Sequence, residues 1–571
     1  MKTMESSENY TFVIIGQGTL AVRCCQFLLS IGIHLEVVMP LDSVFLLWAK
    51  KEGLKCINTI QDLESLVSNN SVEWLFSISN PIILTSALLD NIKLGAFNYH
   101  DAPLPKYAGT HATSWALFAM EDKYAVTWHR IATVVDAGDI AVQQNVEINR
   151  SDTALSLNMK CYNAAFEGFK KLISLIKGGK PIEYVKQNVS ERSFFSSRKR
   201  PYAGACLQWA HSAEELSALV RGLSFGERYR NPLCVPKVYL INIIGIVKTL
   251  EVLSVSTHKQ AGILVDIAQN FWIVTTGTTD IRIEFIQLTG EDLRADFLAD
   301  MLCISVGDSL PIINNSDLED LTQEHEELAP YESFWVNRLE SFRPLNFKFD
   351  TLYHDLDCIF EIYYNWNLYI DIDIENVTSE ERLVNILGAF VVYLALVNDV
   401  QYFHLDCATE LPKHEVIDYS IFFSASVPFE FNIDFNCSAL DLYSSISVER
   451  SILNKFKTFH KDIICRYPQL RSTESLYSKY ICNVRISIID FINSEVKPAV
   501  YQLYEKNNAS LTMQIDPVKG AFRWISNSSH IENADLKRMA DHIISLDRLL
   551  LSNPNLPLKS LLSQCGTLGI I

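Results

Sequence analysis

TFVIIGQGTLAVRCCQFLLSIGIHLEVVMP, residues 11–40, decides the fold of this chain. The apolar run at 11–15 predicts a buried strand, and the glycine-containing segment 16–21 predicts a tight turn that leads into a helix ending near residue 31. A second apolar run, 34–39, predicts a strand that Pro40 closes. Strand, glycine turn, helix and strand in this order indicate the start of a parallel α/β sheet.

The same stretch spells G-x-G-x-x-A, and Asp42 falls near the position of an acid that binds a ribose. That pattern is typical of dinucleotide-binding domains, although alone it is a weak signal. At this point both a nicotinamide enzyme and an enzyme that uses the same opening fold without a dinucleotide remain open.

Three polar side chains are expected to meet at one edge of this sheet. Further strands are predicted at 74–79 and 94–99, and the second one delivers Asn98 and His100, which point to the same side because they are two residues apart. Ligands bind at the carboxyl ends of such strands. Asp136 follows in a small-residue turn, DAGD. A carboxamide, an imidazole and a carboxylate together suit acyl transfer to an amine without a metal.

Ordered motifs from residue 97 to residue 140 carry a resemblance to a known family. They are N-x-H (Asn98, His100), L-P-x-x-x-G (Leu104, Pro105, Gly109), V-T-x-H (Val126, Thr127, His129) and D-x-G-D-I (136–140). This set resembles the formyltransferases that use 10-formyltetrahydrofolate. The segment PLPKYAGTHATSW, 103–115, is similar to the formylation domains that begin nonribosomal peptide synthetases. The resemblance favours a Rossmann-like catalytic domain over 11–190 and argues against bound NAD.

The resemblance also implies roles for the three polar residues. Asn98 would direct an amide N–H toward the formyl oxygen, and Asp136 would lie near His100, fixing its tautomer or relaying a proton. His100 would either accept the proton of the amine or hydrogen-bond the oxyanion. For His129 a substrate contact and a satisfied, partly buried side chain are equally open, and for His111 a role at a helix start competes with a site role.

The formyl donor implied by the resemblance is 10-formyltetrahydrofolate, with no metal. Its pterin would lie in an apolar slot made by backbone of the third strand and of the turn that carries Asp136, with the loop 104–109 flanking the active site. The expected donor-binding residues are Phe76, Ser77, Ile78, Asn80, Leu104, Val135, Gly138 and Asp139.

Two further units are expected after the catalytic domain. RGLSFGERYRNP, 221–232, resembles the entry to the small OB-like β-barrel domain of this family, assigned to 191–310. The acidic stretch NNSDLEDLTQEHEELAP predicts a linker or a solvated helix within 311–330. Segments of 331–571 resemble the C-terminal lobe of a condensation domain, a chloramphenicol-acetyltransferase-like half-domain. The His-His-x-x-x-Asp-Gly motif is missing, so this lobe is expected to be non-catalytic, either a docking module or a remnant.

Composition limits the partners and the compartment. The 571-residue chain carries a net charge of −18 with one compact basic cluster, 198–200, which disfavours nucleic acid such as a tRNA as substrate. No apolar run is long enough to span a membrane, and the first residues lack the apolar core of a signal peptide. The 13 cysteines show no C-x-x-C pair, so we expect neither a zinc site nor a disulfide framework, and a cytoplasmic protein.

The sequence therefore predicts an enzyme that formylates the amine of an amino acid in nonribosomal peptide biosynthesis. The expected partner is a peptidyl carrier protein or synthetase subunit that holds the amino acid. The alternative is formylation of a small free amine such as an amino-sugar nucleotide, for which the condensation-like tail has no evident use.

Overall fold

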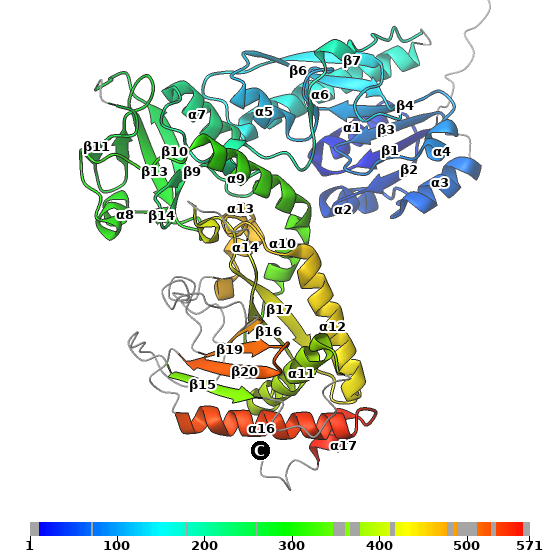
Figure 1. Ribbon diagram of the computed structural model, residues 1–571. Coiled ribbons are helices and arrows are strands. Elements are labelled where there is room, and N and C mark those ends of the chain that lie inside the picture. Colours follow the sequence, from blue (N-terminus) through cyan, green and yellow to red (C-terminus); the bar gives the residue numbers. More distant parts are fainter. Residues whose placement is uncertain are drawn as a thin grey trace, which may run out of the picture.

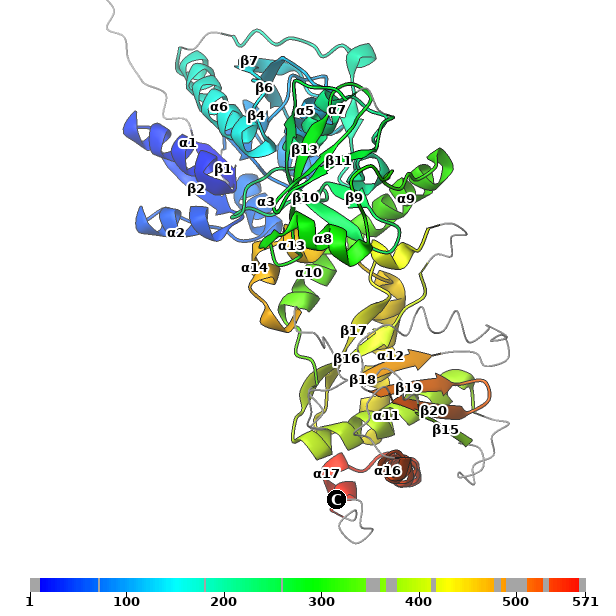
Figure 2. The same cartoon turned by 90° about the vertical axis from the view of Figure 1, so that its left-hand side faces the viewer.

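The computed structural model describes residues 11–69, 72–178, 181–257, 260–345, 360–365, 377–411, 417–476, 484–488, 511–526 and 533–563. Within these residues the chain forms three six-stranded sheets, with helices packed on them. The first two sheets lie side by side, and the third belongs to a C-terminal lobe that projects away from them (Figures 1 and 2).

The N-terminal sheet has the strand order β2-β1-β3-β4-β6-β7. Its first four strands are parallel, as the sequence predicts, whereas β6 runs antiparallel to β4 and β7 antiparallel to β6. The strands are β1 (Phe12–Gly16), β2 (Leu35–Pro40), β3 (Trp74–Ile78), β4 (Gly95–His100), β6 (Lys123–Arg130) and β7 (Ile140–Glu147).

Both faces of this sheet are covered, which explains why its first strands are apolar throughout. In β1, Phe12 and Ile14 belong to a core with α1 and α6, whereas Val13 and Ile15 belong to a second core with α3 and α4. The helices are α1 (Gly18–Ser30), α2 (Ser43–Lys51), α3 (Ile60–Asn69), α4 (Ser86–Asp90), α5 (Ala112–Phe118) and α6 (Ala154–Lys177). With the faces filled, the strand ends and the loops after them are left for polar chemistry.

The second sheet is antiparallel, in the order β11-β12-β13-β10-β9 with β14 on β13. The Thr/Gly-rich run 275–279 joins the antiparallel neighbours β12 and β13. The OB-like barrel expected here stays a prediction. The elements are α7 (Ala213–Gly222), β9 (Lys237–Tyr239), β10 (Ile244–Val252), β11 (Leu264–Ile267), β12 (Trp272–Val274), β13 (Ile281–Ile286), β14 (Asp292–Leu293) and α8 (Ala295–Leu302). The segment before α7 holds η1 (Val189–Glu191), β8 (Phe194–Phe195), which pairs with β5 (Ala108–Gly109), and η2 (Tyr202–Ala205).

The C-terminal lobe has a mixed sheet in the order β15-β20-β19-β18-β16-β17. Residues of α11, α12 and α16 share one apolar core with its strands. Its likeness to a condensation domain stays a prediction. The elements are β15 (Phe360–Asn365), α11 (Ser379–Asn398), β16 (Tyr402–Ala408), η6 (Tyr419–Ile421), β17 (Ser426–Asn432), α12 (Ala439–Phe456), α13 (Ile463–Arg466), α14 (Pro468–Arg471), η7 (Glu474–Leu476), β18 (Val484–Ile488), β19 (Leu511–Asp516), β20 (Ala521–Ser526), α16 (Asn533–Ser552) and α17 (Leu558–Leu562).

The stretch expected to be a linker or a solvated helix is the helix α9 (Asn315–Leu328), which continues through η3 (Ala329–Tyr331) into α10 (Glu332–Glu340). Asn314 caps α9 through the N–H of Asp317. One face of the helix is buried against η2, where the N–H of Ala203 donates to Thr322 Oγ1 at 2.7 Å. The buried residues of that face are Leu318, Leu321, His325 and Leu328. Helix α9 is therefore a packed element and not a free tether.

Buried ion pairs join the N-terminal half, which holds the first two sheets, to the C-terminal half, which begins with α10 and holds the third sheet. Lys237 Nζ of β9 lies 2.7 Å from Asp462 Oδ2, and Arg466 Nη2 of α13 lies 2.6 Å from Glu332 Oε2 of α10. Arg200 Nη2 lies 3.8 Å from Glu332 Oε2, and all five of these side chains are buried. We call these five residues the junction cluster. Because removing one partner of a buried pair leaves an uncompensated charge, the cluster couples the halves strongly.

Candidate active site

Asn98, His100 and Asp136 meet at the carboxyl end of β4. His100 Nδ1 lies 3.7 Å from Asp136 Oδ2, and His129 Nε2 of β6 lies 3.5 Å from Asp136 Oδ1. The amide Nδ2 of Asn98 lies 3.3 Å from His129 Nε2. The register of β4 against β6 pairs Asn98 with His129, which explains how residues far apart in sequence share one cluster. The predicted three residues are thus together, and His129 joins them.

The turn that carries Asp136 is held by several contacts. Asp136 has a φ of 54°, a left-handed conformation that Asp tolerates better than most residues. Gly138 is required, because a Cβ there would lie 1.8 Å from the carbonyl oxygen of Arg130. Gln187 Nε2 donates to the Asp136 carbonyl at 2.9 Å, and Arg192 Nη2 donates to the Val135 carbonyl at 2.8 Å.

The carboxylate of Asp136 is kept ionised. Burial alone would raise its pKa, but the neighbouring imidazoles of His129 and His100 and the N–H of Gly109, which donates to Oδ2 at 2.9 Å, outweigh burial and lower the pKa to about 2. A fixed negative charge beside an imidazole stabilises the protonated form of that imidazole.

The tautomer of His100 follows from one contact. Its Nε2 lies 2.9 Å from the carbonyl oxygen of Tyr107, and because a carbonyl can only accept, Nε2 carries a hydrogen. The nitrogen that can gain or lose a proton is therefore Nδ1, the one that faces Asp136. His100 is 6% exposed, so this exchange takes place in a site with little water.

His129 is fixed in the same manner. Its Nδ1 donates to the carbonyl of Arg130 at 2.8 Å, which leaves Nε2 to accept from the Asn98 amide. A proton on Nε2 would instead bond Asp136 and oppose the Asn98 N–H. The protonation of His129 and the position of the Asn98 amide are thus linked, and His129 belongs to the cluster rather than to the core alone.

The eight expected donor-binding residues divide into two groups. The side chains of Phe76 and Ile78 are buried in the apolar core, and Leu104 packs with Ala108 and Ile140, so their side chains do not face an open site and only their backbone can take part. Ser77 and Asn80 are hydrogen-bonded toward Asn98, and Val135, Gly138 and Asp139 lie in the turn that carries Asp136, with Val135 exposed. The binding of the donor by these residues stays a prediction.

Two other residues singled out from sequence lie at helix starts. Asp42 caps α2 through the N–H of Phe45 and also accepts from the N–H of Gly18 at 2.9 Å, so both of its carboxylate oxygens are engaged. His111 precedes α5, and burial, with Arg200 and Arg230 nearby, lowers its pKa to about 4.

The sequence did not point to Tyr107, Gln187 or Arg192. Gln187 and Arg192 lie in the segment 183–205, which has no regular pattern, and they act on backbone atoms of the Asp136 turn. Tyr107 contributes a carbonyl group, which no residue-type pattern can signal.

Residues 57–173 match the sequence model of the family described as Formyl transferase. The chain contains a formyltransferase domain. The cluster at β4 lies inside the matched residues, and the prediction that the chain is a formyltransferase enzyme is confirmed.

Several solved structures are similar to this chain at low identity. WlaRD, a sugar 3N-formyl transferase solved with dTDP and 5-N-formyl-THF, is 20% identical, with 49% of this chain and 99% of that chain covered and a TM-score of 0.39. An N-formyltransferase from Helicobacter canadensis, solved with folinic acid and dTDP-3-aminofucose, is 20% identical (48% and 100% covered, TM-score 0.40). HypX from Aquifex aeolicus, solved with tetrahydrofolic acid, is 10% identical (52% and 48% covered, TM-score 0.38), so this chain spans about half of its length.

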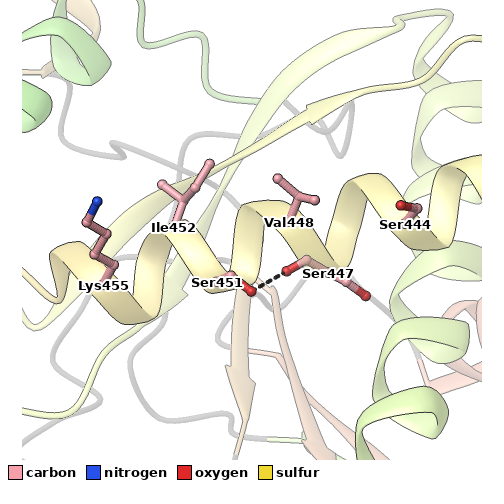
Figure 3. A pocket seen from close by; sticks show the side chains of 6 residues that line it. All are labelled: Ser444, Ser447, Val448, Ser451, Ile452 and Lys455. Atoms are coloured by element: carbon pink, nitrogen blue, oxygen red, sulfur yellow. Dashed lines mark hydrogen bonds between the residues drawn. The ribbon is translucent and has the colours of Figure 1, made fainter.

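A pocket of about 390 Å³ lies on α12 in the C-terminal lobe (Figure 3). Its lining residues all belong to this one helix, and Lys455 is the acid–base group among them. They are Ser444, Ser447, Val448, Ser451, Ile452 and Lys455. Among the described residues no helix is long and apolar enough to cross a membrane, and no group of three or more His, Cys, Asp or Glu side chains could hold a metal ion.

Proposed function

We propose that this chain transfers a formyl group from 10-formyltetrahydrofolate to the amine of an amino acid held on a peptidyl carrier protein. The observation that carries the proposal is the cluster of Asn98, His100 and Asp136, within residues that match the formyltransferase family. The motif segment 103–115 and the C-terminal lobe support the peptide-synthetase context. In this proposal the second sheet is the OB-like domain and the lobe is condensation-like.

The geometry gives each residue a step. His100 Nδ1 takes the proton of the attacking amine, because Nε2 is already bonded to the Tyr107 carbonyl. Asp136 stabilises the imidazolium that results, at 3.7 Å. Asn98 donates an N–H to the formyl oxygen as negative charge develops there. The bond from the formyl carbon to the amine forms, the bond to the folate nitrogen breaks, and the proton held by His100 passes to that nitrogen.

The test is a formyl-transfer assay with purified full-length protein and 10-formyltetrahydrofolate. Three acceptors are compared by mass spectrometry: an aminoacyl carrier protein, the free amino acid and an amino-sugar nucleotide. We expect the carrier-bound amine to be formylated with the highest kcat/KM. His100→Ala should lower the rate about 10²–10⁴-fold. The control His34→Ala, at a side chain that is 77% exposed and directly precedes β2, should leave the rate unchanged.

Two outcomes would contradict the proposal. Formylation of the amino-sugar nucleotide alone would favour the small-amine enzyme. A wild-type protein that formylates none of the three acceptors would show that the assigned reaction is wrong.

A further inference from the structure

We propose that Ser77 and Asn80 are positioning residues that hold the Asn98 side chain with its amide N–H groups, and not its oxygen, toward the reacting formyl group. The inference rests on the proposed function, since it concerns the orientation of the oxyanion donor. It starts from a run of side-chain hydrogen bonds that leads from the loop after β3 to β4.

The orientation of Asn80 is fixed by backbone. The N–H of Ile82 donates to Asn80 Oδ1 at 2.8 Å, and Asn80 Nδ2 donates to the carbonyl of Ile82 at 3.0 Å. A backbone N–H can only donate and a carbonyl can only accept, so these two contacts assign the oxygen and the nitrogen of this amide.

The direction of the next bond follows from the first. Asn80 Nδ2 lies 3.2 Å from Ser77 Oγ, and because that nitrogen can only donate, Ser77 accepts there. The single hydroxyl hydrogen of Ser77 is then directed at Asn98 Oδ1, which lies 2.7 Å away. Ser77 is 3% exposed, so little water competes for either bond.

The strand register makes this contact possible. β3 and β4 are parallel neighbours in which Ser77 pairs with Asn98, so the two side chains stand on the same side of the sheet. With its oxygen held by Ser77, Asn98 presents its nitrogen to His129 Nε2 at 3.3 Å and a second N–H to the site. A turned amide would set its oxygen against the lone pair of His129 and against the oxyanion.

Asn80→Asp tests the relay with almost no change in volume. Aspartate can still accept from the Ile82 N–H, but its second oxygen draws the Ser77 hydroxyl toward itself and away from Asn98. We expect kcat to fall about 10-fold or more, toward the 10²–10³-fold loss of a missing oxyanion donor. Asn145→Asp, an exposed change on β7, is the matched control and should keep full activity.

A double-mutant cycle separates positioning from a structural role. Ser77→Ala should lower kcat in the wild type and have no further effect when Asn98 is already Ala, whereas Ser77→Thr, which keeps the hydroxyl, should restore most of the rate. Equal losses from Ser77→Ala in both backgrounds, or a full kcat for Asn80→Asp, would overturn the inference.

The relay can be judged even if the proposed reaction fails. In protein labelled with ¹⁵N-asparagine, the side-chain amide signal of Asn98 is identified by its loss in Asn98→Ala. We expect Asn80→Asp to shift this signal and Asn145→Asp to leave it in place. An unshifted signal would overturn the relay whatever the acceptor, while a shifted signal in a protein without transferase activity would count against the proposed function alone.

Discussion

Asp136→Asn removes a charge from the site and almost nothing else. An asparagine oxygen can still accept from the N–H of Gly109, and asparagine also tolerates the left-handed backbone at this position, with φ of 54°. What is lost is the attraction between the carboxylate and a protonated His100, whose Nδ1 lies 3.7 Å away.

The size of the loss follows from that distance. At an effective dielectric constant of about 20, unit charges about 4 Å apart attract by about 4 kcal/mol, which corresponds to about 10³-fold in rate if the imidazolium is fully formed in the transition state. Side chains and water that adjust will recover part of it, so we expect kcat/KM to fall about 10²–10³-fold. The acidic limb of the pH–rate profile should still not report Asp136 in the wild type, because the neighbouring His129 and His100 outweigh burial and leave its pKa at about 2.

The assay is formyl transfer by the wild type, the two single variants and the double variant His100→Ala, Asp136→Asn. Because Asp136 is assigned to act through His100, the double variant should be no slower than His100→Ala alone. Asp122→Asn, an exposed charge change in the same domain, is the control. If the double variant loses activity by the product of the two single losses, Asp136 does not act through His100. Near wild-type turnover in Asp136→Asn would refute the role of its charge.

Three further perturbations test the turn and the junction. Gly138→Ala should lower kcat about 10²-fold in steady-state assays, because its Cβ would clash with the Arg130 carbonyl at 1.8 Å and displace the Asp136 turn; unchanged kinetics would show that the turn tolerates the shift. Glu332→Gln removes one of the two carboxylates that pair with the buried Arg466, the other being Asp462, and urea unfolding should show a loss of about 1–3 kcal/mol; an unchanged midpoint would contradict the coupling. Burial lowers the pKa of His460 from 6.5 to about 4, so acid protonates this histidine more readily in the unfolded chain than in the folded one. The free energy of unfolding should therefore fall by about 3 kcal/mol between pH 6.5 and pH 4. His460→Gln should make this fall smaller, and an equally steep fall in the variant would show that other groups cause it.

The sequence predicted the parts of the fold that local pattern controls. The expected strands 74–79 and 94–99 correspond to β3 (Trp74–Ile78) and β4 (Gly95–His100), because continuous apolar runs bounded by turn residues have few alternatives in a sheet covered on both faces. It did not predict that β6 and β7 run antiparallel, since strand direction depends on connections across the sheet.

The site was predictable where residue type carries the chemistry. Asn98, His100 and Asp136 could be named because a carboxamide, an imidazole and a carboxylate have recognisable roles. His129 stayed undecided until the register of β4 against β6 placed it beside Asn98. The Tyr107 carbonyl was out of reach, because backbone groups look alike in every sequence.

The acidic stretch 314–330 shows how composition can hide packing. Its charges indicate a solvated segment, yet Leu318, Leu321, His325 and Leu328 recur at helical spacing and form the buried face of α9. The helical spacing was present in the sequence, but three leucines and a histidine form only a thin apolar stripe along the helix. The surface of η2 against which this stripe packs is distant in sequence.

This packing decides how the role of the C-terminal lobe can be examined. A cut within or after α9 would remove the ion-pair partners of Lys237 and Arg200 and would expose the apolar residues that η2 shares with α9 and with residues 417–423. Such a fragment would lose stability whether or not the lobe binds a carrier, so its behaviour could not separate a docking module from a remnant. A charge placed on the exposed face of α12, as in Val448→Glu at a side chain 58% exposed, leaves the junction cluster intact. If such a surface substitution lowers kcat/KM for the carrier-bound amine, the loss can be assigned to the surface of the lobe and not to a destabilised protein.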